Sequence, residues 1–135
     1  MSQADVARVA DAGGRLIVMP HADFDVVRAA RSAGLFVAPG IATPTEAFAA
    51  LAAGADGLKL FPAEMIGPPV VKALRAVLPK DAILIPVGGI SEANIPAYRV
   101  AGANAFGIGS TLYAPGRTAV DVGRIARALV TALGT

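Results

Sequence analysis

The stretch Gly57-Leu-Lys-Leu-Phe-Pro62 is a short apolar run that one charged residue, Lys59, interrupts. A short apolar run closed by proline is typical of a strand covered on both faces in a parallel sheet. Four similar runs occur along the chain, and successive runs begin 20 to 25 residues apart. The five predicted strands are Arg15–Met19, Leu35–Ala38, Gly57–Phe61, Ala82–Val87 and Ala105–Gly109.

Helical patterns fill the intervals between these runs. Apolar residues recur on one helix face within Val70–Leu78 and again within Val122–Leu133. A capping box, with Thr43 as N-cap and Glu46 closing it, predicts one helix start, and Ser91 predicts another. Three glycines are expected to end helices: Gly34, Gly54 and Gly102. Alternation of strands and helices predicts an α/β fold with a parallel sheet.

The number of units restricts the architecture. Five β/α units, preceded by a short helix over roughly Gln3–Asp11, fill the 135 residues as one domain, residues 1–135. A closed (β/α)₈ barrel needs eight units and about 200 to 250 residues. The chain is therefore either a small open α/β sheet of flavodoxin type or the C-terminal part of such a barrel, and the spacing alone does not separate the two.

Composition excludes several classes of protein. An apolar fraction of 55% with 16% charged residues excludes a disordered chain, and no apolar run is long enough for a membrane span. The net charge of +2 comes from scattered arginines, so nucleic-acid binding is not expected. The chain has no cysteine, which excludes disulfides, zinc fingers and thiol catalysis. The first ten residues lack the pattern of a signal peptide, so a cytoplasmic location is the expectation.

Lys59 carries the candidate chemistry. In a strand it shares a face with Phe61, which in a barrel would be the interior. Burial disfavours the ammonium form, and a neutral amine can attack a carbonyl and form a Schiff base. The alternative is a lysine whose stem packs while its ammonium reaches solvent. Pro62 places Lys59 near the C-terminal end of its strand, where barrel active sites lie, and favours the functional interpretation.

Two glycine turns predict a phosphate site. Pro86-Val-Gly-Gly-Ile90 and Gly107-Ile-Gly-Ser-Thr111 each follow a predicted strand. Glycines let backbone N–H groups approach an anion, and the last two strand-to-helix loops of a barrel are its common phosphate site. Other polar candidates receive structural interpretations: His21 as a solvated loop residue, Glu46 as the capping residue, and Glu64 as a supporting carboxylate or a helix-start acid.

These phrases together resemble the class I aldolases that act on 2-keto-3-deoxy-6-phosphogluconate or 2-keto-3-deoxy-6-phosphogalactonate. The resemblance covers nearly the whole chain, and its most specific part is Lys59-Leu-Phe-Pro-Ala-Glu64. It implies a (β/α)₈ barrel, a homotrimer, and catalysis without a metal or other cofactor. The substrate would be cleaved to pyruvate and glyceraldehyde 3-phosphate. The other matching phrases are Val18-Met-Pro-His21, Ala38-Pro-Gly-Ile-Ala-Thr-Pro-Thr-Glu46 and the two glycine turns.

The resemblance also implies roles for individual residues. Lys59 would be the Schiff-base lysine, and Phe61 would pack beside it. Pro20 and Pro39 would shape the substrate rim. Val87 stands where the gluconate type commonly has threonine, which favours the galactonate type. The phosphate would be bound by Gly88, Gly89, Gly109 and Ser110.

One departure from the family pattern keeps alternatives open. The family's first strand carries a glutamate acting as general acid and base, and nothing here corresponds, because the matching begins at about the fourth unit. His21 and Glu64 are conceivable substitutes. One alternative is therefore a truncated, catalytically impaired fragment that retains phosphate binding and self-association. Another is a different phosphate-binding barrel, such as an isomerase, in which Lys59 is only a charge.

Overall fold

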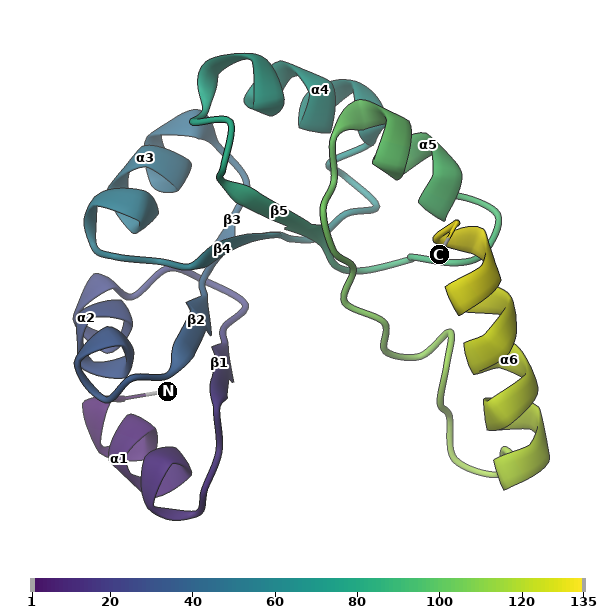
Figure 1. Ribbon diagram of the computed structural model, residues 1–135, viewed down its shortest axis with the longest axis horizontal. Coiled ribbons are helices and arrows are strands. Elements are labelled where there is room, and N and C mark those ends of the chain that lie inside the picture. Colours follow the sequence, from purple (N-terminus) through teal and green to yellow (C-terminus); the bar gives the residue numbers. More distant parts are fainter. Residues whose placement is uncertain (1, 135) are drawn as a thin grey trace.

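The computed structural model describes residues 2–134, and strands and helices alternate along them as the sequence predicts. Figure 1 shows the strands along the inner side of a curve and the helices along its outer side. The elements are α1 (Gln3–Asp11), β1 (Leu16–Val18), α2 (Phe24–Ser32), β2 (Phe36–Ala38), β3 (Gly40–Ile41), α3 (Pro44–Ala52), β4 (Gly57–Leu60), α4 (Pro68–Val77), β5 (Ile83–Pro86), α5 (Ile95–Ala101) and α6 (Ala119–Ala132).

All strand pairing is parallel, which confirms the predicted sheet type. β1 pairs with β2, and β4 lies between β3 and β5 in a second small sheet. Within that sheet Lys59 is aligned with Gly40 on one side and Ile85 on the other. Aligned residues of parallel strands point to the same face, so Lys59 and Ile85 share the inner face.

The fifth predicted strand, Ala105–Gly109, is wrong as a strand. This segment makes one isolated parallel bridge, between Val87 and Gly107. The amides of Ala105 and Gly107 donate to the carbonyls of Leu84 and Pro86 in β5, whereas the Gly109 carbonyl accepts from the turn that follows, at Leu112 and Tyr113. Pairing on one side and two glycines within five residues both weaken a strand.

The short strand β3 was not predicted. It arises where Pro39 interrupts the run that begins with β2, because proline has no amide hydrogen to donate to a sheet. Beyond this residue the chain pairs with β4 instead. The Lys59 amide donates to the Pro39 carbonyl, 2.9 Å away, at the point where the partner strand changes.

Local signals for helix ends are largely confirmed. Thr43 and Glu46 form the predicted capping box at the start of α3. Gly34, Gly54 and Gly102 follow or end helices with positive φ, which glycine adopts without strain. The start predicted at Ser91 is wrong: α5 begins at Ile95, and the Asn94 side chain accepts a hydrogen bond from the Ser91 amide.

The core lies between the helices and the outer face of the strands. Leu58, Leu60 and Leu84 point to that side and are fully buried. The predicted stripe on α4 is confirmed at Val71 and Leu74, whereas Val77 is exposed. No helix within residues 2–134 is long and apolar enough to cross a membrane.

Arg75 fastens α4 to the neighbouring loops. Its guanidinium donates to the carbonyls of Ala82 and Gly102 and to the side chain of Asn104, over distances of 2.8 to 3.1 Å. The Asn104 oxygen in turn accepts a hydrogen bond from the Leu84 amide in β5. One cation thus holds the helix, β5 and the segment after α5 in register, which fixes the inner face on which Lys59 lies.

Candidate functional site

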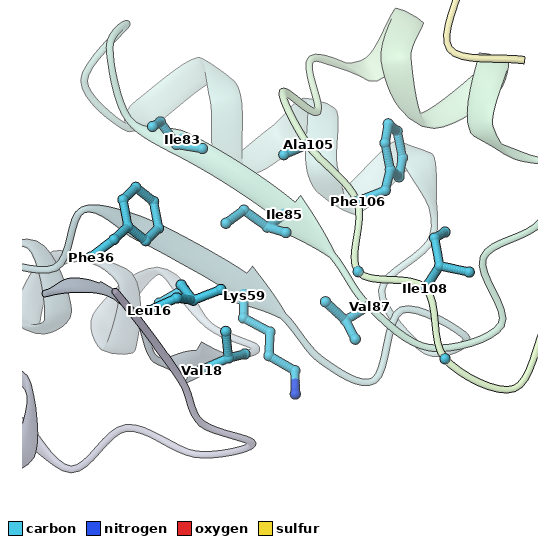
Figure 2. A pocket seen from close by; sticks show the side chains of 13 residues that line it. Leu16, Val18, Phe36, Lys59, Ile83, Ile85, Val87, Ala105, Phe106 and Ile108 are labelled. Atoms are coloured by element: carbon cyan, nitrogen blue, oxygen red, sulfur yellow. The ribbon is translucent and has the colours of Figure 1, made fainter. Parts of the chain in front are cut away.

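Lys59 lies on the inner face of the curved sheet. Alternation along β4 buries Leu58 and Leu60 in the core and directs the Lys59 side chain inwards, as the sequence predicts (Figure 2). The residue is only 9% exposed. Its Nζ atom lies 4.2 Å from the centre of the Phe61 ring. The two residues that the strand pattern assigned to one face are therefore in contact.

The hollow around Lys59 has a volume of about 660 Å³ and is almost entirely apolar. Among its lining residues, all within the described chain, Lys59 alone is ionisable. Figure 2 shows the lysine extending from β4 among aliphatic and aromatic side chains. The lining residues are Leu16, Val18, Phe36, Ala38, Lys59, Ile83, Ile85, Val87, Ala105, Phe106, Gly107, Ile108 and Gly109.

Burial lowers the pKa of the Lys59 amine from its ordinary value. The cause is desolvation, since an apolar environment stabilises an ammonium ion less than water does. The face of the Phe61 ring attracts a cation and opposes this effect. The net result is an amine that loses its proton more readily than a solvated lysine, as nucleophilic attack on a carbonyl requires.

A second, smaller pocket of about 230 Å³ lies beside this hollow and contains the two predicted glycine turns. The pocket and the hollow share three lining residues: Val87, Gly107 and Gly109. The structure therefore brings Lys59, Phe61 and all four predicted phosphate ligands into two adjoining spaces. The pocket residues are Phe61, Glu64, Val87, Gly88, Gly89, Ile90, Gly107, Gly109, Ser110 and Thr111.

The turn at Gly88 and Gly89 requires glycine at both positions. The φ angles are 108° and 61°, in the left-handed region. A Cβ atom added at Gly88 would lie 2.3 Å from Oε2 of Glu64, and one at Gly89 would lie 2.8 Å from its Cγ. The Asn94 side chain donates to the Gly89 carbonyl over 2.9 Å and fixes the far side of the turn.

The structural interpretation of Glu46 is confirmed, but that of Glu64 as a helix-start acid is wrong. Glu46 accepts hydrogen bonds from the amides of Ala42 and Thr43. Glu64 lies before α4, whose first turn contains no acid, and instead lines the glycine pocket. Sequence reasoning missed this placement because it depends on a contact between two loops more than twenty residues apart.

The remaining predicted residues lie at the rim or farther away. Gly40, beside Lys59 in the sheet, has no side chain, and a Cβ there would lie 2.4 Å from the Pro20 carbonyl oxygen. Pro20 therefore packs next to the strand that neighbours Lys59. Pro39 is buried, and His21 is exposed with its carbonyl accepting from the Gly40 amide. Neither the hollow nor the glycine pocket is lined by Pro20, Pro39 or His21.

Comparison with known proteins matches the chain to one family. The family model for KDPG and KHG aldolases matches residues 1–128. A probable 2-dehydro-3-deoxy-6-phosphogalactonate aldolase from Rhizobium meliloti (strain 1021) is 49% identical over 98% of this chain and 62% of its own length. The 2-dehydro-3-deoxy-6-phosphogalactonate aldolase from Escherichia coli (strain K12) is 43% identical over 94% of this chain and 62% of its length.

The fold comparison agrees with the sequence comparison. A solved structure described as native KDPGal superposes with a TM-score of 0.95 at 42% identity, over 98% of this chain and 64% of that one. The chain thus spans somewhat less than two thirds of the length of these relatives. On the family match and the identity, the chain belongs to the KDPG and KHG aldolase family.

Proposed function

We propose that the chain is a Schiff-base aldolase that cleaves a phosphorylated 2-keto-3-deoxy sugar acid to pyruvate and glyceraldehyde 3-phosphate. One observation carries the proposal: a buried lysine amine with a lowered pKa adjoins a glycine pocket able to hold an anion. The apolar lining of the hollow strengthens electrostatic interactions at the amine, which is itself largely buried. Family membership supports the same reaction class.

The proposed reaction proceeds through an imine on Lys59. The neutral amine attacks the C2 carbonyl, the carbinolamine loses water, and a protonated imine forms. The C3–C4 bond then breaks: its electron pair moves to the iminium nitrogen, while the C4 hydroxyl gives up its proton and becomes the aldehyde. Protonation of the enamine at C3 and hydrolysis release pyruvate and restore the amine.

The other site residues act by position. Phe61 packs against the amine, and Val87 bounds the substrate. Pro20 and Pro39 line neither space and would act only by supporting the strand beside Lys59. Backbone N–H groups would bind the substrate phosphate, as glycine-rich turns do. These groups belong to Gly88, Gly89, Gly109 and Ser110, which line one pocket.

The galactonate epimer is the proposed substrate. Relatives that share 43% and 49% identity bear the 6-phosphogalactonate name. Three relatives that bear the 2-dehydro-3-deoxy-phosphogluconate aldolase name share 33% or 34% identity. Val87 supports the same choice, because it stands before the glycine pair, where the gluconate type commonly has threonine, and it lines both spaces where the substrate would lie.

We further propose that residues 1–135 form one unit equivalent to five β/α units of a (β/α)₈ barrel. The parallel pairing, the inner-face hollow and the fit to a structure of that family support this arrangement. A homotrimer and a cytoplasmic location remain predictions from the resemblance and from the sequence.

A second candidate is an impaired member of the family that retains phosphate binding and self-association. The apolar hollow favours it, because inner-face residues Leu16 and Phe36 are 53% and 37% exposed, and such surfaces promote association. The lining of the hollow, within residues 2–134, also contains no carboxylate to move the protons of the reaction.

Reductive trapping separates the two candidates. Pyruvate and borohydride should modify Lys59 in the intact chain, and peptide mass mapping locates the adduct. The Lys59→Arg variant keeps the charge but forms no imine, and Lys72→Arg, at an exposed lysine on α4, is the matched control. Absence of an adduct at Lys59, with phosphate binding intact, would exclude the lyase and favour the impaired form.

A further inference from the structure

The glycine pocket contains a carboxylate that the proposed reaction does not use. Glu64 lines the pocket together with all four proposed phosphate ligands. The other lining residues are aromatic, aliphatic, glycine or hydroxyl-bearing, so within the described chain Glu64 is the pocket's one ionisable side chain. A space proposed to hold an anion therefore has a negative charge in its wall and no cation.

The Glu64 carboxylate is close to the groups that would bind phosphate. Its Oε2 lies 2.3 Å from the position a Cβ would take on Gly88, and its Oε1 lies 3.1 Å from the corresponding position on Gly89. The carboxylate thus covers the same turn whose N–H groups would bind the anion. Within residues 2–134 it forms no ion pair or hydrogen bond that would neutralise or hold it.

The charged and titratable groups around Glu64 do not cancel its charge. On α5, the Tyr98 hydroxyl donates to the carbonyls of Ala63 and Ile66, and both burial and the charge of Glu64 raise the pKa of that hydroxyl. From β4, the Lys59 amine contacts the ring of Phe61, and Phe61 lines the pocket whereas Lys59 does not. Beyond Thr111, the Arg117 guanidinium donates to the Thr111 carbonyl.

We infer that Glu64 determines ligand charge in the glycine pocket, by disfavouring doubly charged phosphate relative to the singly charged form. This inference rests on the proposed placement of the substrate phosphate at the glycine turns. The physical basis is repulsion between the carboxylate and the anion, which is larger for two charges than for one. Glu64 is thus a specificity-determining residue that tunes retention of the phosphate end.

Anion binding tests the inference without any carbonyl chemistry. Calorimetry would measure binding of glycerol phosphate and of sulfate to the full chain at about pH 7.5 and about pH 5.5. A phosphate monoester carries two negative charges at the higher pH and mostly one at the lower, because its second pKa is about 6. Sulfate keeps both charges throughout. The ratio of the two affinities therefore cancels pH effects that act on both anions alike.

The native chain should bind glycerol phosphate relatively better at the lower pH. Glu64→Gln should bind both anions about fivefold tighter at the higher pH and lose this preference. Glu64→Asp keeps the charge and should retain the preference. Asp11→Asn removes an equal charge at the exposed end of α1, outside the pocket, and should change nothing. Amide resonances of Gly88 and Gly89 would report folding and the place of binding.

Two results would overturn the inference: Glu64→Gln binding no tighter than the native chain, or neither protein binding either anion at the glycine turn. Neither result depends on Lys59. Tighter binding by Glu64→Gln together with failed pyruvate trapping would remove the proposed lyase and leave the role of Glu64 intact.

Discussion

Replacing Lys59 by methionine should stabilise the fold. The lysine stem is buried, so methionine keeps most of its packing and removes only a charged amine that the hollow solvates poorly. Removing a poorly solvated charge contributes about 1 to 2 kcal/mol, and loss of the contact with the Phe61 ring, 4.2 Å away, offsets about 0.5 to 1 kcal/mol of it. The expected net gain is about 1 kcal/mol at neutral pH.

The gain should depend on pH in a defined direction. Burial holds the pKa of the folded-state amine below the ordinary value. The unfolded chain therefore binds more protons between the folded and the ordinary pKa, and native stability rises with pH across that interval. The difference between Lys59→Met and the native chain should be complete below the folded-state pKa and vanish above the ordinary value of about 10.4.

Urea denaturation of both proteins from neutral pH upwards measures this difference directly, because the other titrating groups are common to both. Lys72→Met replaces an exposed lysine on α4 and should change stability by less than about 0.5 kcal/mol. A Lys59→Met variant that is less stable than the native chain at neutral pH would refute the reasoning. So would a stability difference that stays constant up to alkaline pH.

Three substitutions test the scaffold that positions the site, each by chemical denaturation. Leu58→Ala should cost about 3 kcal/mol, because the side chain is fully buried on the face opposite Lys59; a cost below about 1 kcal/mol would contradict that placement. Arg75→Met should cost about 2 kcal/mol, because three protein acceptors within 3.1 Å lose their donor. An unchanged denaturation midpoint would show that water satisfies those acceptors and would contradict this prediction. Thr43→Ala removes the N-cap of α3 and should cost about 1 kcal/mol of stability. Thr45→Ala is the control, because Thr45 lies within the helix and is not its cap.

Patterns that act over a few residues predicted most of the fold. The two-residue period of β4 placed Leu58 and Lys59 on opposite faces, and both placements are confirmed. Capping chemistry at Thr43 was equally local. The prediction of a strand at Ala105–Gly109 was wrong, because the segment makes only one bridge and strand formation depends on neighbours that the sequence of a segment does not show.

The site was predictable where chain order and sheet topology decide it. Parallel strands deliver their carboxyl ends to one edge, which brought the Gly88–Gly89 turn and Ser110 together beside Lys59. The position of Glu64 was not predictable, because it depends on how the loop after β4 packs against the loop after β5. The switch of pairing partner at Pro39 was missed for a similar reason.

The central claim is that the Lys59 amine loses its proton more readily than an ordinary lysine, and its pKa tests that claim directly. Side-chain NMR of isotopically labelled lysine, titrated in the intact chain and assigned with Lys59→Arg, measures it site by site. The account predicts that the resonance of Lys59 titrates with a pKa below the ordinary lysine value of about 10.4. Titration of Lys59 at or above that value would contradict it.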